Sequence, residues 1–172
     1  MERIYIAGGC LWGVQHFFKS IPGVLNTEAG RANGCTNSLD GEYDGTVVTL
    51  GKGFDDVELV EEADGPRLKC MAASLLSKIA KKALAESLAG FEFASGIPGS
   101  IGGAVFMNAG AYGGEIVDVL ESVELLSPNS DGKWELKTVP AEELELTYRH
   151  SRLQETKELV VSATLKLPRG DK

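Results

Sequence analysis

The stretch from residue 96 to residue 115 constrains this chain more than any other part of its sequence. Seven of its twenty residues are glycine, and many of the others are apolar and need burial, which is not typical of a linker. Glycine allows positive φ angles and lets the backbone approach a neighbour closely. The stretch is neither a Walker loop nor a G-x-G-x-x-G turn after a strand. Two interpretations therefore remain open: a ligand cradle, or tight packing of a helix against a strand.

A helix is expected to begin after Pro98-Gly99-Ser100 and to include the residues near Ile101 to Met107. The first backbone N–H groups of a helix have no partner within that helix, and they attract anions. In the cradle interpretation, these N–H groups would be free to face a diphosphate.

The net charge limits the partners that the chain can bind. Lysine and arginine number 17 against 25 acidic residues, which gives a formal charge of −8. Because such a chain repels polyphosphate at long range, neither nucleic acid nor an anionic membrane is an expected partner. No apolar run approaches the roughly 20 residues of a membrane span, and the N-terminus lacks the pattern of a secretory signal. We therefore expect a cytoplasmic protein.

The cysteines predict neither a disulfide framework nor a metal site. Cys10, Cys35 and Cys70 are odd in number, lie far apart and form no C-x-x-C pair. We expect Cys35 and Cys70 to be structural or incidental.

Hydrophobic periodicity predicts an α+β fold, with a mixed sheet of short strands and packed helices. Strands are expected at Thr46–Leu50, Asp56–Glu61, Arg67–Met71, Glu121–Ser127, Trp134–Val139 and Leu159–Leu167. A short helical turn is expected to begin at Pro140, and Phe91 and Phe93 are expected in the core.

The clearest helical pattern runs from Ser74 to Leu88. Ser74 is the expected N-cap, and Gly90 is expected to close the helix. Its apolar face is predicted to contain Leu75, Ile79, Leu84 and Leu88.

The first 45 residues have a different character and are expected to form a strand-helix-strand unit. The strands are predicted at Ile4–Ala7 and Val24–Ala29, the helix at Trp12–Ile21, and a loop at residues 30–41. We therefore expect two parts, residues 1–45 and residues 46–172.

Three motifs stand out between residues 46 and 168: Leu50-Gly51-Lys52-Gly53-Phe54, the run from Phe91 to Glu115, and Tyr148-Arg149-His150-Ser151-Arg152. Through them this part of the chain resembles the family of UDP-N-acetylenolpyruvoylglucosamine reductases. This resemblance implies an FAD-binding-like fold, a nucleotide-sugar substrate, and hydride transfer from NADPH to FAD and then to the enolpyruvyl group in peptidoglycan precursor synthesis. It assigns FAD contact to Gly99, Ser100, Gly102, Gly103, Asn108 and Tyr112.

The same resemblance makes Arg149 a catalytic residue on the substrate side and Tyr148 a substrate-binding residue. A guanidinium stays charged and can bind the enolpyruvyl carboxylate with two parallel hydrogen bonds. It would also stabilise the enolate-like charge that develops as hydride arrives. From the residues alone, the alternative is a surface arginine that follows a strand.

Residues 4–45 resemble another family, the peptide-methionine (S)-S-oxide reductases. The resemblance rests on Gly8 to Val14, Ile21 to Val24, Glu28 to Gly34 and Asp40 to Gly45. It implies that Cys10, between a strand end and a helix N-terminus that favours thiolate, attacks the sulfoxide sulfur. Trp12 would then pack on the substrate methyl group, and Tyr43 would bind the sulfoxide oxygen. The alternative is that Cys10 is a small buried apolar residue.

Both resemblances depart from their family patterns. Leu11 replaces the usual phenylalanine, and the carboxylic acid expected shortly after Tyr43 is lost at the junction near Asp44-Gly45-Thr46. The flavin reductase family also needs a diphosphate loop and a C-terminal substrate domain with a proton-donating serine. An accidental imitation of that loop by residues 33–38 is the less favoured interpretation. Three hypotheses follow: an incomplete FAD-dependent oxidoreductase, a sulfoxide reductase that uses Cys10, and a non-catalytic chimera.

Overall fold

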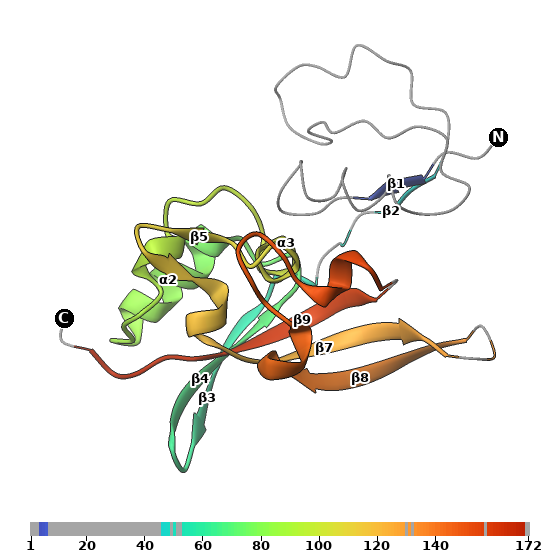
Figure 1. The fold of residues 1–172 in the computed structure, drawn as a ribbon. Coiled ribbons are helices and arrows are strands. Elements are labelled where there is room, and N and C mark those ends of the chain that lie inside the picture. The colour runs from blue at the N-terminus through green and yellow to red at the C-terminus, as the bar shows by residue number, and fades with distance from the viewer. Residues whose placement is uncertain are drawn as a thin grey trace.

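A computed structural model describes residues 4–6, 46–48, 50, 53–129, 131, 133–156 and 158–170. Its largest element is a five-stranded antiparallel sheet with the strand order β3-β4-β9-β7-β8, and helices α2 and α3 lie on one face of this sheet (Figure 1). Two smaller pairs accompany it, β1 with β2 in parallel and β5 with β6 in antiparallel orientation. Within the described part of the chain, no helix is both long and apolar enough to span a bilayer.

The strands follow from the alternation of apolar and polar residues, since successive side chains of a strand point to opposite faces. The strands of the large sheet are β3 (Val57–Glu62), β4 (Gly65–Met71), β7 (Leu120–Pro128), β8 (Trp134–Pro140) and β9 (Leu159–Lys166). The smaller pairs are β1 (Ile4–Ile6), β2 (Thr46–Val48), β5 (Gly110–Ala111) and β6 (Gly114–Glu115). The strands predicted for the described residues are confirmed, with ends that differ by at most two residues.

The helices are short. They are α2 (Leu76–Ala85), α3 (Ile101–Phe106) and the 3₁₀ turns η1 (Glu92–Ala94), η2 (Ile116–Asp118), η3 (Ala141–Leu144) and η4 (Arg152–Gln154). The helix expected after Pro98-Gly99-Ser100 and the helical turn after Pro140 are confirmed, and the fold class agrees with the prediction.

The predicted apolar face of α2 is wrong at two positions. Leu75 is 56% exposed and Leu84 is 71% exposed, whereas Ile79 is fully buried. The buried residues of the helix are Leu76, Ile79 and Ala83. A helix turns about 100° per residue, which places Leu84 roughly 100° from the middle of this buried stripe.

The predicted N-cap is also wrong. Leu75 is the N-cap of α2 and makes no side-chain capping bond, while the hydroxyl of buried Ser74 donates to the carbonyl oxygen of Asp56, 3.0 Å away. Leu75 is extended and pairs with Ser100, so it belongs to a backbone bridge instead of the helix. The helix therefore begins two residues later than predicted and ends at Ala85, before the expected Leu88.

The core lies between the sheet and the helices. Phe91 is buried and meets Phe93 edge to face, with ring centroids 5.7 Å apart, and Phe93 is partly buried against the core. The other large, fully buried side chains include Leu68, Ile79, Ile101, Val105, Leu125, Leu153 and Leu165. Cys70 belongs to this core, and burial raises the pKa of its thiol to about 12, which agrees with a structural role.

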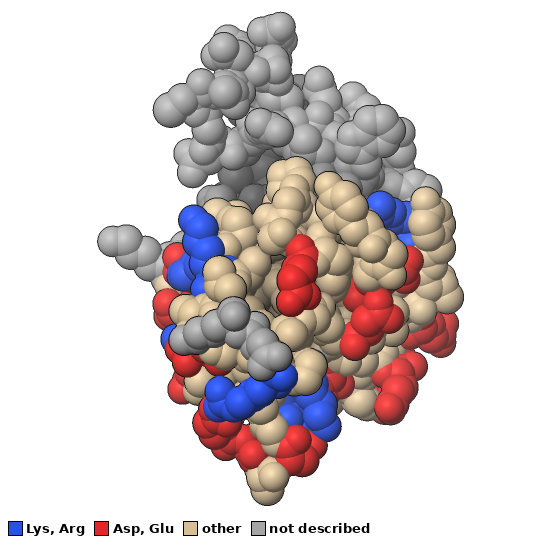
Figure 2. Space-filling view, turned by 90° about the vertical axis from the view of Figure 1, so that its left-hand side faces the viewer, with Lys and Arg blue, Asp and Glu red and all other residues tan. Residues whose placement is uncertain are grey.

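One buried arginine, Arg67, connects the β3–β4 turn to β7. The guanidinium of Arg67 donates to both carboxylate oxygens of Glu121, at 3.0 and 2.8 Å from Nε, and to both oxygens of Asp64 at 2.9 Å. Hydrogen bonds from Lys166 and Arg67 lower the pKa of Asp64 to about 2. Figure 2 shows acidic and basic side chains close together at the lower end of the molecule, where this turn lies.

The remaining predictions for the first 45 residues fall mostly outside the described residues. These are the helix at Trp12–Ile21, the strand at Val24–Ala29, and the roles of Cys10, Trp12, Cys35 and Tyr43. The first predicted strand is confirmed as β1. Its register sets Ile4 beside Thr46 and Ile6 beside Val48, so β1 and β2 join the two parts that the sequence distinguishes.

Candidate functional site

The start of α3 is bound to the segment that precedes α2. The N–H of Ile101 donates to the carbonyl oxygen of Ser74 at 2.9 Å, the N–H of Gly102 donates to Ala72 at 2.9 Å, and the N–H of Leu76 donates to Gly99 at 3.0 Å. The expectation that the first N–H groups of this helix are free to bind an anion is therefore wrong for Ile101 and Gly102. Both N–H groups are hydrogen-bonded to carbonyl oxygens of the segment that precedes α2.

Gly102 is required by this close approach. A β-carbon at Gly102 would lie 3.1 Å from both the side chain and the carbonyl oxygen of Ala72. Such a distance is tighter than ordinary van der Waals contact, so any side chain would push the two segments apart. At this position the packing interpretation of the glycine-rich stretch is the correct one.

The second half of the glycine-rich stretch forms a two-stranded hairpin, β5–β6. Its two central residues, Tyr112 and Gly113, have φ angles of 54° and 86°. Positive φ at both central positions is the mark of a type I′ turn, which suits the twist of a tight hairpin. The turn presents the Tyr112 side chain to solvent, where it is 96% exposed.

Asn108 connects this hairpin to a loop far along the chain. Its buried side-chain amide donates to the Glu115 carboxylate at 2.8 Å and to the carbonyl oxygen of Thr147 at 2.9 Å. Its side-chain oxygen accepts a hydrogen bond from the N–H of Val117 at 3.0 Å. Both amide hydrogens and the oxygen are thus used within the protein, and the structure gives Asn108 a positioning role.

The loop that Asn108 holds carries Tyr148 and Arg149. Thr147 and His150 exchange two backbone hydrogen bonds of 3.1 Å, which close a tight turn, and Arg149 has a φ of 56°. The guanidinium of Arg149 donates to the carbonyl oxygen of Gly110 at 3.1 Å and lies 5.8 Å from the ring centroid of Tyr148. Tyr148 is 80% exposed, so both side chains remain accessible beside the β5–β6 hairpin.

Ser151 anchors the other side of the same turn. Its buried hydroxyl donates to the carbonyl oxygen of Phe106 at 2.7 Å, and the Gln154 amide donates to the same oxygen at 3.4 Å and to the carbonyl oxygen of Arg149 at 3.1 Å. A carbonyl at the end of a helix has no partner within the helix, and here side chains supply one. The sequence indicates Ser151 only as part of a motif. The structure adds that its hydroxyl binds the carbonyl oxygen of Phe106 at the end of α3.

The structure thus brings the Tyr148–Arg149 turn to the C-terminal end of α3, while Gly99 and Ser100 precede its N-terminal end. At about 1.5 Å per residue, six residues separate these ends by about 9 Å. Asn108 and Tyr112 lie near the same end of α3 as Arg149. Cys10, Trp12 and Tyr43 lie outside the described residues.

One side of α3 is only partly buried. Gly103, Phe106 and Met107 are half-buried and share one side of the helix, because residues three and four apart are neighbours. The Gln154 amide contacts this side at the carbonyl oxygen of Phe106 and at the sulfur of Met107. The backbone N–H groups of Ile101 and Gly102 are already hydrogen-bonded, so they do not offer a diphosphate site.

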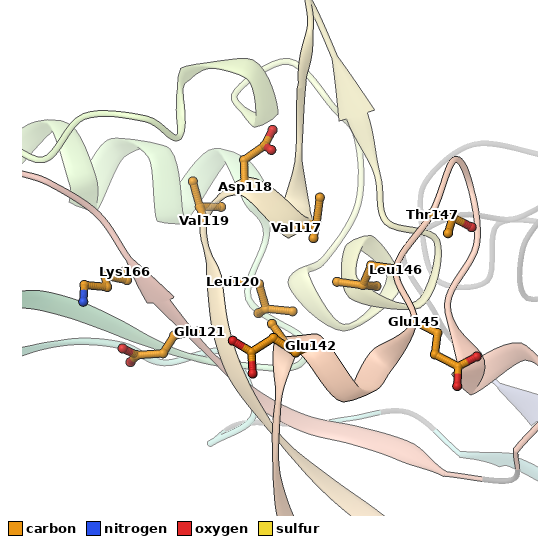
Figure 3. A pocket seen from close by; sticks show the side chains of 11 residues that line it. Val117, Asp118, Val119, Leu120, Glu121, Glu142, Glu145, Leu146, Thr147 and Lys166 are labelled. Carbon is orange, nitrogen blue, oxygen red and sulfur yellow. The ribbon is translucent and has the colours of Figure 1, made fainter.

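A hollow of about 500 Å³ opens beside the start of β7 (Figure 3). Among its lining side chains, the charged ones are Asp118, Glu121, Glu142, Glu145 and Lys166. Glu121 is paired with Arg67, and Asp118 accepts a hydrogen bond from the N–H of Glu115. Because acidic groups predominate, this hollow repels phosphate and does not suit a nucleotide.

Two families match the chain. The FAD binding domain matches residues 29–135, and peptide methionine sulfoxide reductase matches residues 2–52. The first match begins before the predicted boundary at residue 45.

Curated relatives extend the similarity. The UDP-N-acetylenolpyruvoylglucosamine reductase of Agathobacter rectalis is 47% identical over 131 residues, which cover 72% of this chain and 40% of the relative. The reductase of Streptococcus mutans is 49% identical over 132 residues, which cover 77% of this chain and 40% of the relative. The chain therefore spans about 40% of the length of these relatives.

Solved structures share the fold. UDP-N-acetylenolpyruvylglucosamine reductase (MurB) from Thermus caldophilus superposes with a TM-score of 0.59 at 33% identity, over 77% of this chain and 45% of that chain. Cholesterol oxidase from Brevibacterium sterolicum gives a TM-score of 0.61 at 13% identity, over 98% of this chain and 30% of that chain, which shows a common fold alone. Since the FAD binding domain matches more than half of the sequence, and the fold agrees with it, this protein belongs to the FAD binding domain family.

Proposed function

We propose that this chain is the flavin-binding part of a UDP-N-acetylenolpyruvoylglucosamine reductase. The relatives of 47% and 49% identity carry that name, and the fold of the described residues agrees with that of the Thermus caldophilus reductase. In this proposal the whole protein reduces the enolpyruvyl group of the nucleotide sugar in the cytoplasm, with NADPH as the hydride donor. The division into residues 1–45 and 46–172 is part of the same proposal.

One observation carries the proposal. Arg149 lies 39 residues after Gly110 in the sequence, yet its guanidinium donates to the Gly110 carbonyl oxygen. The motif arginine is thereby placed at the edge of the glycine-rich stretch, with Tyr148 beside it. An exposed guanidinium in this position can bind a carboxylate next to a ring stacked on α3.

FAD, when bound, supplies the hydride that reaches the substrate. Gly103, with Phe106 and Met107, would support the flavin ring on the exposed side of α3. Arg149 would hold the enolpyruvyl carboxylate and stabilise the negative charge that develops there. Asn108 would act as a positioning residue, because it fixes the backbone of the Arg149 turn through Thr147.

The proposal is tested by binding measurements on the purified chain. Flavin fluorescence reports FAD binding, and calorimetry with the FAD-loaded protein reports binding of UDP-N-acetylenolpyruvoylglucosamine. We expect Arg149→Ala to weaken sugar-nucleotide binding by about tenfold to a hundredfold, which is the usual range for a charged hydrogen bond. Arg149→Lys should restore part of this affinity, and FAD binding should be unchanged in both variants.

Lys81→Ala on the exposed side of α2 is the matched control, because it also removes one positive charge from the surface. The proposal fails if Arg149→Ala and Lys81→Ala weaken sugar-nucleotide binding equally, or if FAD does not bind at all. The first result would make Arg149 a surface arginine, and the second would remove the flavin role.

The match of residues 2–52 to peptide methionine sulfoxide reductase supports a second candidate function. In that proposal Cys10 is the nucleophile that attacks a methionine sulfoxide, with Trp12 and Tyr43 at the substrate. Dithiothreitol-dependent reduction of a methionine sulfoxide peptide, followed by mass spectrometry, tests it. Activity that survives Cys10→Ser, or no activity in the parent chain, would exclude it.

A further inference from the structure

The large sheet ends in two edge strands with opposite characters. In the order β3-β4-β9-β7-β8, the strands β3 and β8 each pair on one side only within the described part of the chain. An edge strand carries unpaired backbone N–H and C=O groups that can pair with another strand. β3 contains Glu58, Glu61 and Glu62 and no basic residue, so two copies of it repel each other.

β8 differs from β3 because its charges are of opposite sign and two of its large apolar side chains are exposed. Trp134 is 50% exposed and Leu136 is 58% exposed on an edge of seven residues. Leu136 stands between Glu135 and Lys137, whose side chains form an ion pair of 2.6 Å within one chain. An exposed apolar side chain on an edge favours pairing with another strand, and flanking charges of opposite sign do not repel a second copy as like charges do.

Leu136 is also the end of a row of leucines across the sheet. The register places Leu126 of β7 directly beside Leu136 of β8, and the same Leu126 directly beside Leu159 of β9. Directly opposed residues point to the same face of a sheet, with β-carbons about 5 Å apart. The row Leu159–Leu126–Leu136 therefore runs to the edge of the sheet and stops at an exposed side chain.

The charges on β8 are self-complementary. In an antiparallel pair of two β8 strands centred on Leu136, Glu135 of each copy lies opposite Lys137 of the other, and Trp134 lies opposite Thr138. The leucine row then continues without a break from one sheet into the next. Centring the pair on Glu135 or on Lys137 would oppose two like charges, which is destabilising, so one register is favoured.

We propose that β8 is a self-association surface, through which two copies of this chain pair antiparallel about a two-fold axis at Leu136. Each copy presents the same surface, as a two-fold dimer requires. The contact is a strand pair with a few side chains, so we expect a weak dimer whose fraction rises with protein concentration. The proposal is independent of the proposed enzymatic function, since Arg149 and α3 lie outside β8.

Sedimentation velocity of the full chain over a series of concentrations at low salt tests the proposal. We expect a monomer–dimer equilibrium for the parent protein. In a dimer of the E135K variant, lysine faces lysine at two places across the interface, and in a dimer of the K137E variant, glutamate faces glutamate at two places. Either change should raise the dissociation constant of the dimer by about tenfold or more. Circular dichroism should show native folding, because both side chains are about half-exposed.

A mixture of the two variants gives the decisive result. The two lysines that the E135K chain carries on β8 then face the two glutamates that the K137E chain carries there, so the mixture should dimerise although neither variant does so alone. Neither chain of that dimer keeps the ion pair within β8, so recovery must come from pairing between copies.

Four results would overturn the proposal, and the first three come from the parent and the charge variants. The parent could stay monomeric at every concentration, the two variants could dimerise as well as the parent, or the mixture could fail to recover a dimer. Leu136→Asp should also abolish dimerisation, since it would place two carboxylates opposite each other at the centre of the pair. Leu59→Asp on the other edge strand is not a suitable control, because Leu59 packs against the core. A dimer that persists in the Leu136→Asp protein would mean that another surface is used.

Discussion

The side-chain amide of Asn108 donates a hydrogen bond to the carbonyl oxygen of Thr147, 39 residues later in the chain, over 2.9 Å. This bond joins the end of α3 to the turn that carries Arg149. Asn108 also has a φ of 40°, a conformation that asparagine adopts more readily than most residues other than glycine. Asn108 therefore both accommodates a positive φ angle in the backbone and fixes the loop that carries Arg149.

Replacing Asn108 should separate these two contributions. We expect Asn108→Ala to lower the free energy of unfolding by about 2–4 kcal/mol, because it strains the backbone and removes the partners of buried groups. Asn108→Gly should cost less, since glycine accepts the positive φ but also lacks the side chain. Urea denaturation measures both. Equal losses in the two variants would show that the backbone conformation contributes nothing.

The burial of α2 predicts different effects at two apolar positions of the same helix. Ile79→Ala should cost about 2–5 kcal/mol, because the side chain is fully buried in the core. Leu84→Ala should change stability by less than about 0.5 kcal/mol, since that side chain is largely exposed. Thermal or urea unfolding of both variants checks the prediction. A large loss at Leu84 would mean that another surface covers the outer side of the helix.

Cys70 should be unreactive in the folded protein. Burial raises the pKa of its thiol to about 12, so its thiolate fraction at neutral pH is about a thousandfold below that of a free cysteine. In a protein with Cys10→Ser and Cys35→Ser, a thiol reagent should label Cys70 only after urea is added. Rapid labelling under native conditions would contradict the observed core.

The pH dependence of stability should reflect Asp64. Hydrogen bonds from Lys166 and Arg67 lower the pKa of this carboxyl to about 2 in the folded state, below its ordinary value of 3.8. Its contribution to stability is therefore fully present above about pH 4 and is lost as the pH falls toward 2. Asp64→Asn should lower stability near neutral pH and reduce the dependence on pH in this range, measured by urea unfolding at several pH values. Glu143→Gln, at an exposed position of η3, is the control and should leave the curve unchanged.

Much of the secondary structure could be predicted from the sequence, because alternation and helical spacing are local properties. β7, β8 and β9 appear at the expected places, and α3 begins after Pro98-Gly99-Ser100 as its residues indicate. The motif with Tyr148 and Arg149 could also be singled out. The position of the helix boundary at Ser74 could not, because its hydroxyl bonds to Asp56 instead of capping the helix.

By itself, the sequence determined which segments form strands and helices and which motif residues belong to a flavin-binding family, since these depend on residue type and spacing. Only the tertiary structure decided which face of α2 is buried, that Ala72 and Ser74 use the first amides of α3, and that Asn108 and Ser151 hold the Arg149 turn. Each of these depends on a contact between segments that are distant in the chain. Such contacts are selected by the packing of the whole core and by the need of every buried polar group for a partner, and no local pattern records them.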